Sequence, residues 1–199
     1  MNPGGTPRAH IDTAWLLGLV RNQTDRRLRL VACALCRAIW DELSARAREA
    51  VAFAEDLADG GGTDAARQHH FGHLRAEGGS NALRRELWLP ACTVVEGGRS
   101  AAEFAIGSGV APEVEIAVIY DIFAAAFRPI ALAPEWRTGT VTALARQIYE
   151  SRDFSAMPIL ADALQDAGCD STDILHHCRD ASQPHARGCW LVDAVLGHT

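Results

Sequence analysis

The sequence contains no lysine, and all 19 of its basic residues are arginine. This absence excludes Schiff-base catalysis and any P-loop that depends on a lysine. The Gly-x-Ser-x-Gly motif of serine hydrolases is also missing, as is the Gly-x-Gly-x-x-Gly dinucleotide fingerprint after a strand. No pair of carboxylates is spaced for acid–base work. We therefore expect a non-enzymatic protein.

Long apolar runs are missing as well. No window approaches the ~20 apolar residues that a membrane-spanning helix needs. No N-terminal stretch combines a charged start with the apolar core of a signal peptide. We therefore expect a cytoplasmic protein with no membrane partner, whose six cysteines are mostly reduced. This leaves buried thiols, metal binding or redox chemistry as their roles, in place of a disulfide framework.

Strand-like alternation of apolar and polar residues is absent, whereas apolar residues recur at helical spacing. The sequence predicts an all-α fold, a compact helical array with HEAT-like helical hairpins towards the C-terminus. Residues 1–11, rich in glycine and proline, are predicted to form a flexible tail. Residues 12–199 are predicted to form a single all-helical domain, in which the glycine-interrupted segment of about 59–110 is expected to be the variable part.

The strongest predicted helix covers residues 24–44, because its apolar residues follow the i, i+3, i+4, i+7 spacing of a buried stripe. Cys33 and Cys36 lie on a strip beside that stripe, so the helix is apolar over most of its circumference and is expected to be central. The other predicted helices are 12–20, 45–58, 63–77, 81–95, 99–107, 111–127, 140–151, 156–167, 172–179 and 185–196.

Cysteine and histidine are concentrated near the C-terminus, in 169-CDSTDILHHCRDASQPHARGCW-190. Helical phase separates these residues into two sets. His176 points away from the apolar face, and Cys169 falls beside the helix-ending Gly168. The residues expected to face inward are Cys178, Cys189, His185 and, at the edge of the face, His177.

These residues admit two interpretations. Zinc requires four nitrogen or sulfur ligands in a tetrahedron. The candidate ligands are Cys33, Cys36, His185 and Cys189, with His177 and Cys178 as alternates. Alternatively, the cysteines pack as small apolar side chains of a helical core. The core interpretation is favoured because the Cys-x-x-Cys pair lies inside an apolar helix, whereas structural zinc sites usually place it on a turn.

A second histidine-rich stretch is 69-HHFGHLRAE-77. His69 and His73 are spaced i, i+4 and can bind one ion if the segment is helical. The glutamate that a metalloprotease helix carries beside its first histidine is missing. The flanking glycines favour a solvated linker instead.

Charge is distributed unevenly along the chain. The net charge is −6, which argues against a general nucleic-acid-binding protein. Residues 21–37 nevertheless hold five arginines and one acid, whereas residues 150–199 hold eight acids and three arginines. We expect these two ends to be solvated or to attract one another. The alternative is a weak nucleic-acid contact through Arg21, Arg26, Arg27 and Arg29.

Four stretches together resemble a large family of uncharacterised paralogous proteins, found especially in planctomycetes and other large-genome bacteria. They are 25-DRRLRLVACALCRAIW-40, 121-DIFAAAFRPIALAPEW-136, 140-TVTALARQIYESRDFSAMPILADALQDAGCD-170 and 173-DILHHCRDASQPHARGCWLVDAVLG-197. The family pattern reads DRKLRLFACACCRRIW near the start and DILxHCR … HVRGCWxxDxxLG near the end. This chain departs from it at Leu35, where a third cysteine is frequent, and at Ala186, where valine is usual. The resemblance implies the helical fold and no particular activity.

Taken together, these features predict a non-enzymatic protein-interaction or scaffold module with a protein partner. The first alternative is a structural zinc-binding protein, in which the cysteine and histidine cluster joins the N-terminal and C-terminal helices. The second is the arginine-mediated nucleic-acid contact. The sequence leaves the partner and the oligomeric state open.

Overall fold

The computed structural model describes residues 18, 24–78, 85–95, 97–107, 109–127 and 131–198. The regular secondary structure of these residues consists of ten α-helices, α2 to α11, and short 3-10 helices, without any strand. The predicted all-α class is therefore confirmed. The predicted tail 1–11 lies outside the described residues, and so does the predicted helix 12–20 apart from Gly18.

The N-terminal helices α3, α5 and α6 pack around α2, and α4 packs against α3 and α5. Their bounds are α2 (Asp25–Ala38), η1 (Trp40–Glu42), α3 (Ala45–Ala58), α4 (Asp64–Gly78), α5 (Arg85–Thr93) and α6 (Gly98–Ala105). Helix α2 begins where the Thr24 side chain accepts a hydrogen bond from the Arg27 backbone. All of its residues from Leu28 to Cys36 are buried, because it contacts α3, α5, α6 and α7. The predicted central position of this helix is confirmed.

The helix predicted over residues 24–44 is two elements in the structure. Helix α2 ends at Ala38, because the backbone of Ile39 leaves the helical region with φ −116° and ψ 25°. The 3-10 helix η1 then turns the chain into α3, which Ser44 caps by accepting from the Ala47 N–H. The prediction was therefore too long at its C-terminal end.

The glycine-interrupted segment contains helices α4, α5 and α6. Pro90 lies inside α5 without ending it. Helix α6 lies directly on the start of α2, where the Gly98 N–H donates to the Asp25 carboxylate. A Cβ at Gly98 would collide with the Asp25 backbone, so this approach requires glycine.

The C-terminal elements follow a long central helix, α7. Their bounds are α7 (Pro112–Phe127), η3 (Pro134–Trp136), α8 (Gly139–Ser151), η4 (Phe154–Ala156), α9 (Met157–Asp166), α10 (Thr172–Arg179) and α11 (Trp190–Leu196). Helices α7 to α10 agree closely with prediction. Helix α11 begins at Trp190 and not at His185, because Gly188 has φ 97° and Cys189 is extended at φ −46°, ψ 125°. Residues 185–189 therefore form a loop.

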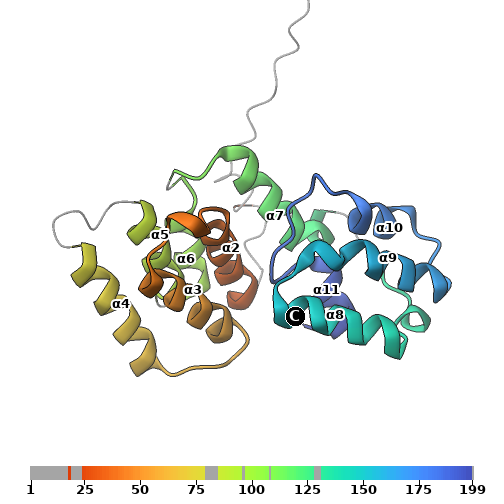
Figure 1. Ribbon diagram of the computed structural model, residues 1–199, viewed down its shortest axis with the longest axis horizontal. Coiled ribbons are helices and arrows are strands. Elements are labelled where there is room, and N and C mark those ends of the chain that lie inside the picture. The colour runs from red at the N-terminus through yellow and green to blue at the C-terminus, as the bar shows by residue number, and fades with distance from the viewer. Residues whose placement is uncertain are drawn as a thin grey trace, which may run out of the picture.

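The core consists of two hydrophobic clusters. Helix α7 lies between the N-terminal helices and the C-terminal helices α8 to α11 (Figure 1). The N-terminal cluster is built from α2 to α7, and the C-terminal cluster from α8 to α11. Helix α7 belongs to both sides, since Ile122 and Phe123 lie in the N-terminal cluster while Ala124 packs against the other. The boundary between the clusters is called the seam below.

Ion pairs cross the seam. Arg26 of α2 donates to the carboxylate of Asp193 in α11, at 2.6 Å and 2.9 Å. The Tyr149 hydroxyl of α8 donates to Asp59, and Arg187 donates to the same carboxylate at 2.6 Å. The Arg26–Asp193 pair joins the arginine-rich segment 21–37 to the acid-rich segment 150–199, which corresponds to one of the two predicted arrangements, attraction, the other being solvation.

Candidate metal centre

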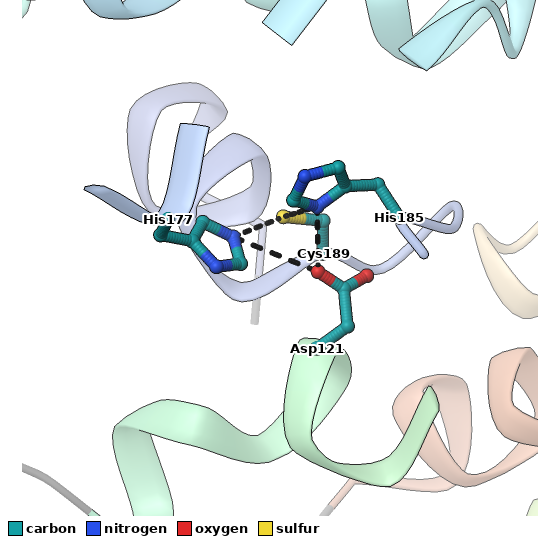
Figure 2. A group of neighbouring side chains, drawn as sticks. All are labelled: Asp121, His177, His185 and Cys189. Carbon is teal, nitrogen blue, oxygen red and sulfur yellow. Dashed lines mark hydrogen bonds and ion pairs between the residues drawn. The ribbon is translucent and has the colours of Figure 1, made fainter. Parts of the chain in front are cut away.

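Four side chains that can bind a metal converge beside α7 (Figure 2). They are Asp121, His177, His185 and Cys189, and their potential ligand atoms all lie within 4.8 Å of one another. Asp121 comes from the middle of α7, and His177 from α10. His185 comes from the following loop, and Cys189 is the N-cap residue of α11. Three of the four belong to the C-terminal side of the seam, and Asp121 faces them from α7.

Four of the separations between these atoms lie within about 0.4 Å of those in a tetrahedral zinc site. Zinc bonds of about 2.0–2.3 Å at tetrahedral angles place neighbouring ligand atoms about 3.3–3.6 Å apart. The His177 Nε2 atom lies 3.2 Å from Cys189 Sγ and 3.6 Å from Asp121 Oδ1. The His185 Nδ1 atom lies 2.9 Å from Asp121 Oδ1 and 4.0 Å from Cys189 Sγ. One ion can therefore contact all four atoms with only small adjustments.

The group is almost completely shielded from solvent. Cys189 is fully buried and Asp121 is 1 % exposed, while the His177 and His185 side chains are 9 % and 7 % exposed. Among the described residues, the ion-pair partners of Asp121 are these two imidazoles, and no arginine reaches it. Because a buried carboxylate is costly without a cation, the site favours a positively charged occupant.

Burial also controls the protonation of the ligands. Burial lowers the pKa of His177 to about 4, so the imidazole is neutral and able to bind a metal at neutral pH. Burial raises the pKa of the Cys189 thiol well above its usual value, and the nearby Asp121 carboxylate raises it further. The thiol therefore keeps its proton unless a cation replaces that proton, as metal binding does.

A β-turn places His185 and Cys189. The Cys189 N–H donates to the Ala186 carbonyl at 2.8 Å, and Gly188 supplies the positive φ that the third position of a type II turn requires. Gly188 packs against Leu30 of α2, which holds the turn on the seam. The turn therefore brings the His185 side chain, which precedes it, close to Cys189 at the start of α11.

Further partners orient the four side chains. The Ala186 N–H donates to Asp121 Oδ2 at 2.9 Å, which leaves Oδ1 facing the two histidines and the cysteine. The backbone groups of Val192 and Leu191 lower the pKa of the Cys189 thiol, against the larger effect of burial, and so favour the thiolate. Outer hydrogen bonds of this kind are what hold metal ligands in place.

The arrangement differs from that of a cysteine nucleophile. A nucleophilic cysteine needs an accessible sulfur with a lowered pKa. Cys189 is fully buried and its pKa is raised. The same Nε2 atom of His177 also faces both Cys189 and Asp121, which suits a shared central ion better than a relay along the ring.

The structure separates the residues that the sequence proposed as zinc ligands. It brings together His185, Cys189 and the alternate His177. Cys33 and Cys36 lie outside this group, buried in the N-terminal cluster with Cys92 next to Cys36. Cys178 also lies outside it, buried in the C-terminal cluster. The six cysteines are all buried and free, as the core interpretation expects for Cys33 and Cys36.

Sequence reasoning missed Asp121, which supplies the oxygen ligand. It stands inside the apolar run 116-IAVIYDIFAAAF-127, and an acid in such a run must find a buried partner. A single acid within an apolar run was therefore the signal in the sequence that could have identified Asp121 as a site residue. The predicted outward direction of His176 is confirmed, since its side chain is 76 % exposed.

The arginines proposed for nucleic acid are used within the fold where they are described. Arg26 is paired with Asp193 and Asp59, and Arg29 is buried and donates to the carbonyls of Thr93 and Val95. Arg27 lies 4.0 Å from the Asp193 carboxylate. Arg21 lies outside the described residues.

No family model, curated protein or solved structure matches the chain. Within the part of the chain that the structure describes, no helix has the length and apolar character needed to cross a bilayer.

Proposed function

We propose that this protein is a structural metalloprotein that holds one zinc ion between Asp121, His177, His185 and Cys189. The observation that carries the proposal is the convergence of these four ligand atoms within 4.8 Å of one another. The set replaces the predicted one, since His185 and Cys189 are kept and Asp121 and His177 take the places of Cys33 and Cys36. The role remains the predicted one, which is to join the N-terminal and C-terminal helices.

Ligand chemistry selects zinc among the common metals. One thiolate, two imidazoles and one carboxylate are the ligand types that zinc accepts, whereas calcium and magnesium prefer oxygen alone. Four protein ligands complete a tetrahedron and leave no position for water or substrate. A closed site of this kind is structural, because a catalytic zinc keeps one position open.

The position of the ion gives it a mechanical role. Asp121 belongs to α7, whose neighbours Ile122 and Phe123 are part of the N-terminal cluster. The other three ligands belong to α10, α11 and the loop between them. An ion bound to all four side chains therefore ties the C-terminal helices to α7, in addition to the ion pairs across the seam.

Zinc content tests the proposal directly. Protein purified without a histidine tag, after growth with added zinc, is expected to carry about one zinc per chain by elemental analysis, because tight structural sites survive purification. Cys189→Ser and Asp121→Asn should each lose most of it. Cys178→Ala is the matched control, since Cys178 is a buried cysteine outside the group, and it should retain the metal. A content below about 0.1 zinc per chain in the wild type would refute the proposal.

Cobalt substitution provides a second readout. Tetrahedral Co²⁺ bound to one thiolate should give visible d–d bands and a sulfur-to-metal charge-transfer band in the near ultraviolet. The charge-transfer band should disappear in Cys189→Ser and persist in Cys178→Ala. A band that survives in Cys189→Ser would assign the sulfur ligand to another cysteine.

We also propose the interaction or scaffold role, the HEAT-like hairpins and the cytoplasmic location that the sequence predicts. A non-enzymatic interaction or scaffold role is compatible with a closed structural site. The packing of α8 on α9 and of α9 on α10 supports HEAT-like hairpins. A cytoplasmic, reducing location would keep the Cys189 thiol available for zinc. The inward use of Arg26 and Arg29 counts against the nucleic-acid alternative.

A further inference from the structure

Two histidines lie side by side on the surface of α4, away from the buried centre. His69 and His73 are one turn apart, and the segment that contains them is helical from Asp64 to Gly78. Both residues are exposed, and their ring centroids are 4.2 Å apart at an interplanar angle of 63°. The solvated linker that the flanking glycines favoured is therefore wrong for this segment, which is helical, and the pair shares one face of the helix.

The space above this pair is open. The two rings flank a hollow of about 330 Å³, which is also lined by Gln68, Gly72 and Ala76. A Cβ placed on Gly72 would meet no atom within 4 Å, so the helix surface beside the two imidazoles is open. An ion and its bound waters can therefore occupy this position without displacing protein atoms.

The neighbouring imidazole is placed differently. His70 is only partly exposed, and its ring stacks on Phe53 of α3 at a centroid distance of 4.7 Å. Its ring is 5.9 Å from that of His69, compared with 4.2 Å between His69 and His73. The close, exposed pair thus consists of His69 and His73, while His70 fastens α4 to α3.

We propose that His69 and His73 form a second, open metal site on α4 for a borderline divalent cation such as Ni²⁺, Cu²⁺ or Zn²⁺. Imidazole nitrogen is the ligand that these ions favour over Ca²⁺ and Mg²⁺. Two protein ligands leave the remaining coordination positions to water or to a donor group of a partner. The site is therefore exchangeable, in contrast to the closed centre at the seam, and its existence does not depend on that centre.

Nickel is a suitable probe. We would titrate Ni²⁺ into the untagged, zinc-loaded chain by calorimetry and compare His69→Gln and His73→Gln with the wild type. Each substitution should weaken nickel binding by about tenfold or more, because the second imidazole acts at a high effective concentration. Glutamine is at least as good a helix former as histidine, so α4 should persist, and circular dichroism verifies this. His70→Gln and His176→Gln are the controls, because His176 is exposed but has no histidine three or four positions away, and both variants should bind nickel like the wild type.

The possible outcomes separate this site from the seam centre. Equal nickel affinity in His69→Gln, His73→Gln and the wild type would overturn the proposal. Loss of nickel binding in His70→Gln would also overturn it, because the site would then not be the pair. The zinc content of His69→Gln is measured in the same samples and reports on the seam centre alone. Weakened nickel binding in His69→Gln and His73→Gln, with the zinc content of both variants unchanged, would establish the α4 site.

Discussion

Arg26 and Asp193 form an ion pair with an N–O distance of 2.6 Å, although 167 positions separate them in the chain. Asp193 is fully buried, and a second nitrogen of the same guanidinium approaches its other oxygen at 2.9 Å. The pair connects the first described helix of the N-terminal cluster to α11. The two sides of the seam are therefore joined by an ion pair as well as by apolar packing. Each charge of this pair relies on the other to offset the cost of its burial.

Replacing Asp193 by asparagine should strongly destabilise the protein. The substitution leaves the Arg26 guanidinium in the seam without its buried counter-charge, which typically costs about 3 kcal/mol. Asp162→Asn is the matched control, because Asp162 pairs with Arg179 at the surface, with side chains 72 % and 43 % exposed. That change should cost less than about 1 kcal/mol. Urea denaturation measures both, and equal effects would contradict the structural role of the Arg26–Asp193 pair.

Acid should weaken the seam through Asp59. Burial alone would raise the pKa of Asp59, but hydrogen bonds from Tyr149 and Arg26 outweigh it and hold the pKa below its usual 3.8. A carboxyl whose pKa is lower in the folded state stabilises the fold above its unfolded pKa and loses this contribution as the pH falls through the folded value. The free energy of unfolding should therefore fall more steeply between about pH 5 and pH 3 in the wild type than in Asp59→Asn.

Tyr149→Phe provides the control for this pH dependence. It removes one of the hydrogen bonds that lower the pKa of Asp59 but keeps the carboxyl. Its slope should fall between those of the wild type and Asp59→Asn. Neither residue is a proposed zinc ligand, so acid release of zinc affects the three proteins equally. Parallel slopes in all three would show that Asp59 does not contribute to acid sensitivity.

Much of the helical fold could be predicted because many helix ends depend on nearby residues. Helix α3 agrees with the predicted 45–58, because the cap at Ser44 and the break at Asp59 and Gly60 are visible in the sequence itself. The predicted start of α11 was wrong because the true start depends on residues that are distant in sequence. Gly188 lies against Leu30, and this contact holds the turn that precedes Trp190, so the helix begins after the turn.

The site was only half predictable for a similar reason. His177, His185 and Cys189 lie within a stretch whose ends are 12 positions apart, so their clustering was visible in the sequence. Asp121 is 56 positions or more from the other three residues (177 − 121 = 56), and a single acid has no diagnostic spacing. Cys33 and Cys36 have the spacing of a ligand pair, but α2 is buried on all sides and directs them into the core. Spacing alone could not distinguish a ligand from a core cysteine.

Two glycine substitutions should have opposite effects on stability. Gly188→Ala places a side chain at φ 97°, with its Cβ 2.9 Å from Leu30 Cδ1, and should destabilise the protein by about 2–3 kcal/mol. Gly72→Ala adds a Cβ in open space inside a helix and should stabilise it by about 0.5–1 kcal/mol. Chemical denaturation compares the two variants with the wild type. A neutral Gly188→Ala would mean that the turn before Cys189 tolerates another conformation.

Removing zinc should lower the thermal stability of the wild type. A ligand that binds only the folded state stabilises it by about 4 kcal/mol when its free concentration is 1,000 times its dissociation constant. For a chain of this size, such a change corresponds to a melting temperature lower by roughly 10 °C in a strong chelator. Added zinc should restore the original value, because the ion reconnects α7 with α10 and α11.

The Asp121→Asn variant determines whether this effect comes from the proposed centre. Its melting temperature should respond neither to the chelator nor to added zinc, while Cys178→Ala should respond as the wild type does. The amide oxygen introduced by this substitution can still accept the hydrogen bond from the Ala186 N–H, so the loop keeps its main anchor and the loss is confined to metal binding. If Asp121→Asn keeps the full response to chelator, the stabilising ion is bound elsewhere in the chain, and the assignment of the centre to the seam is wrong.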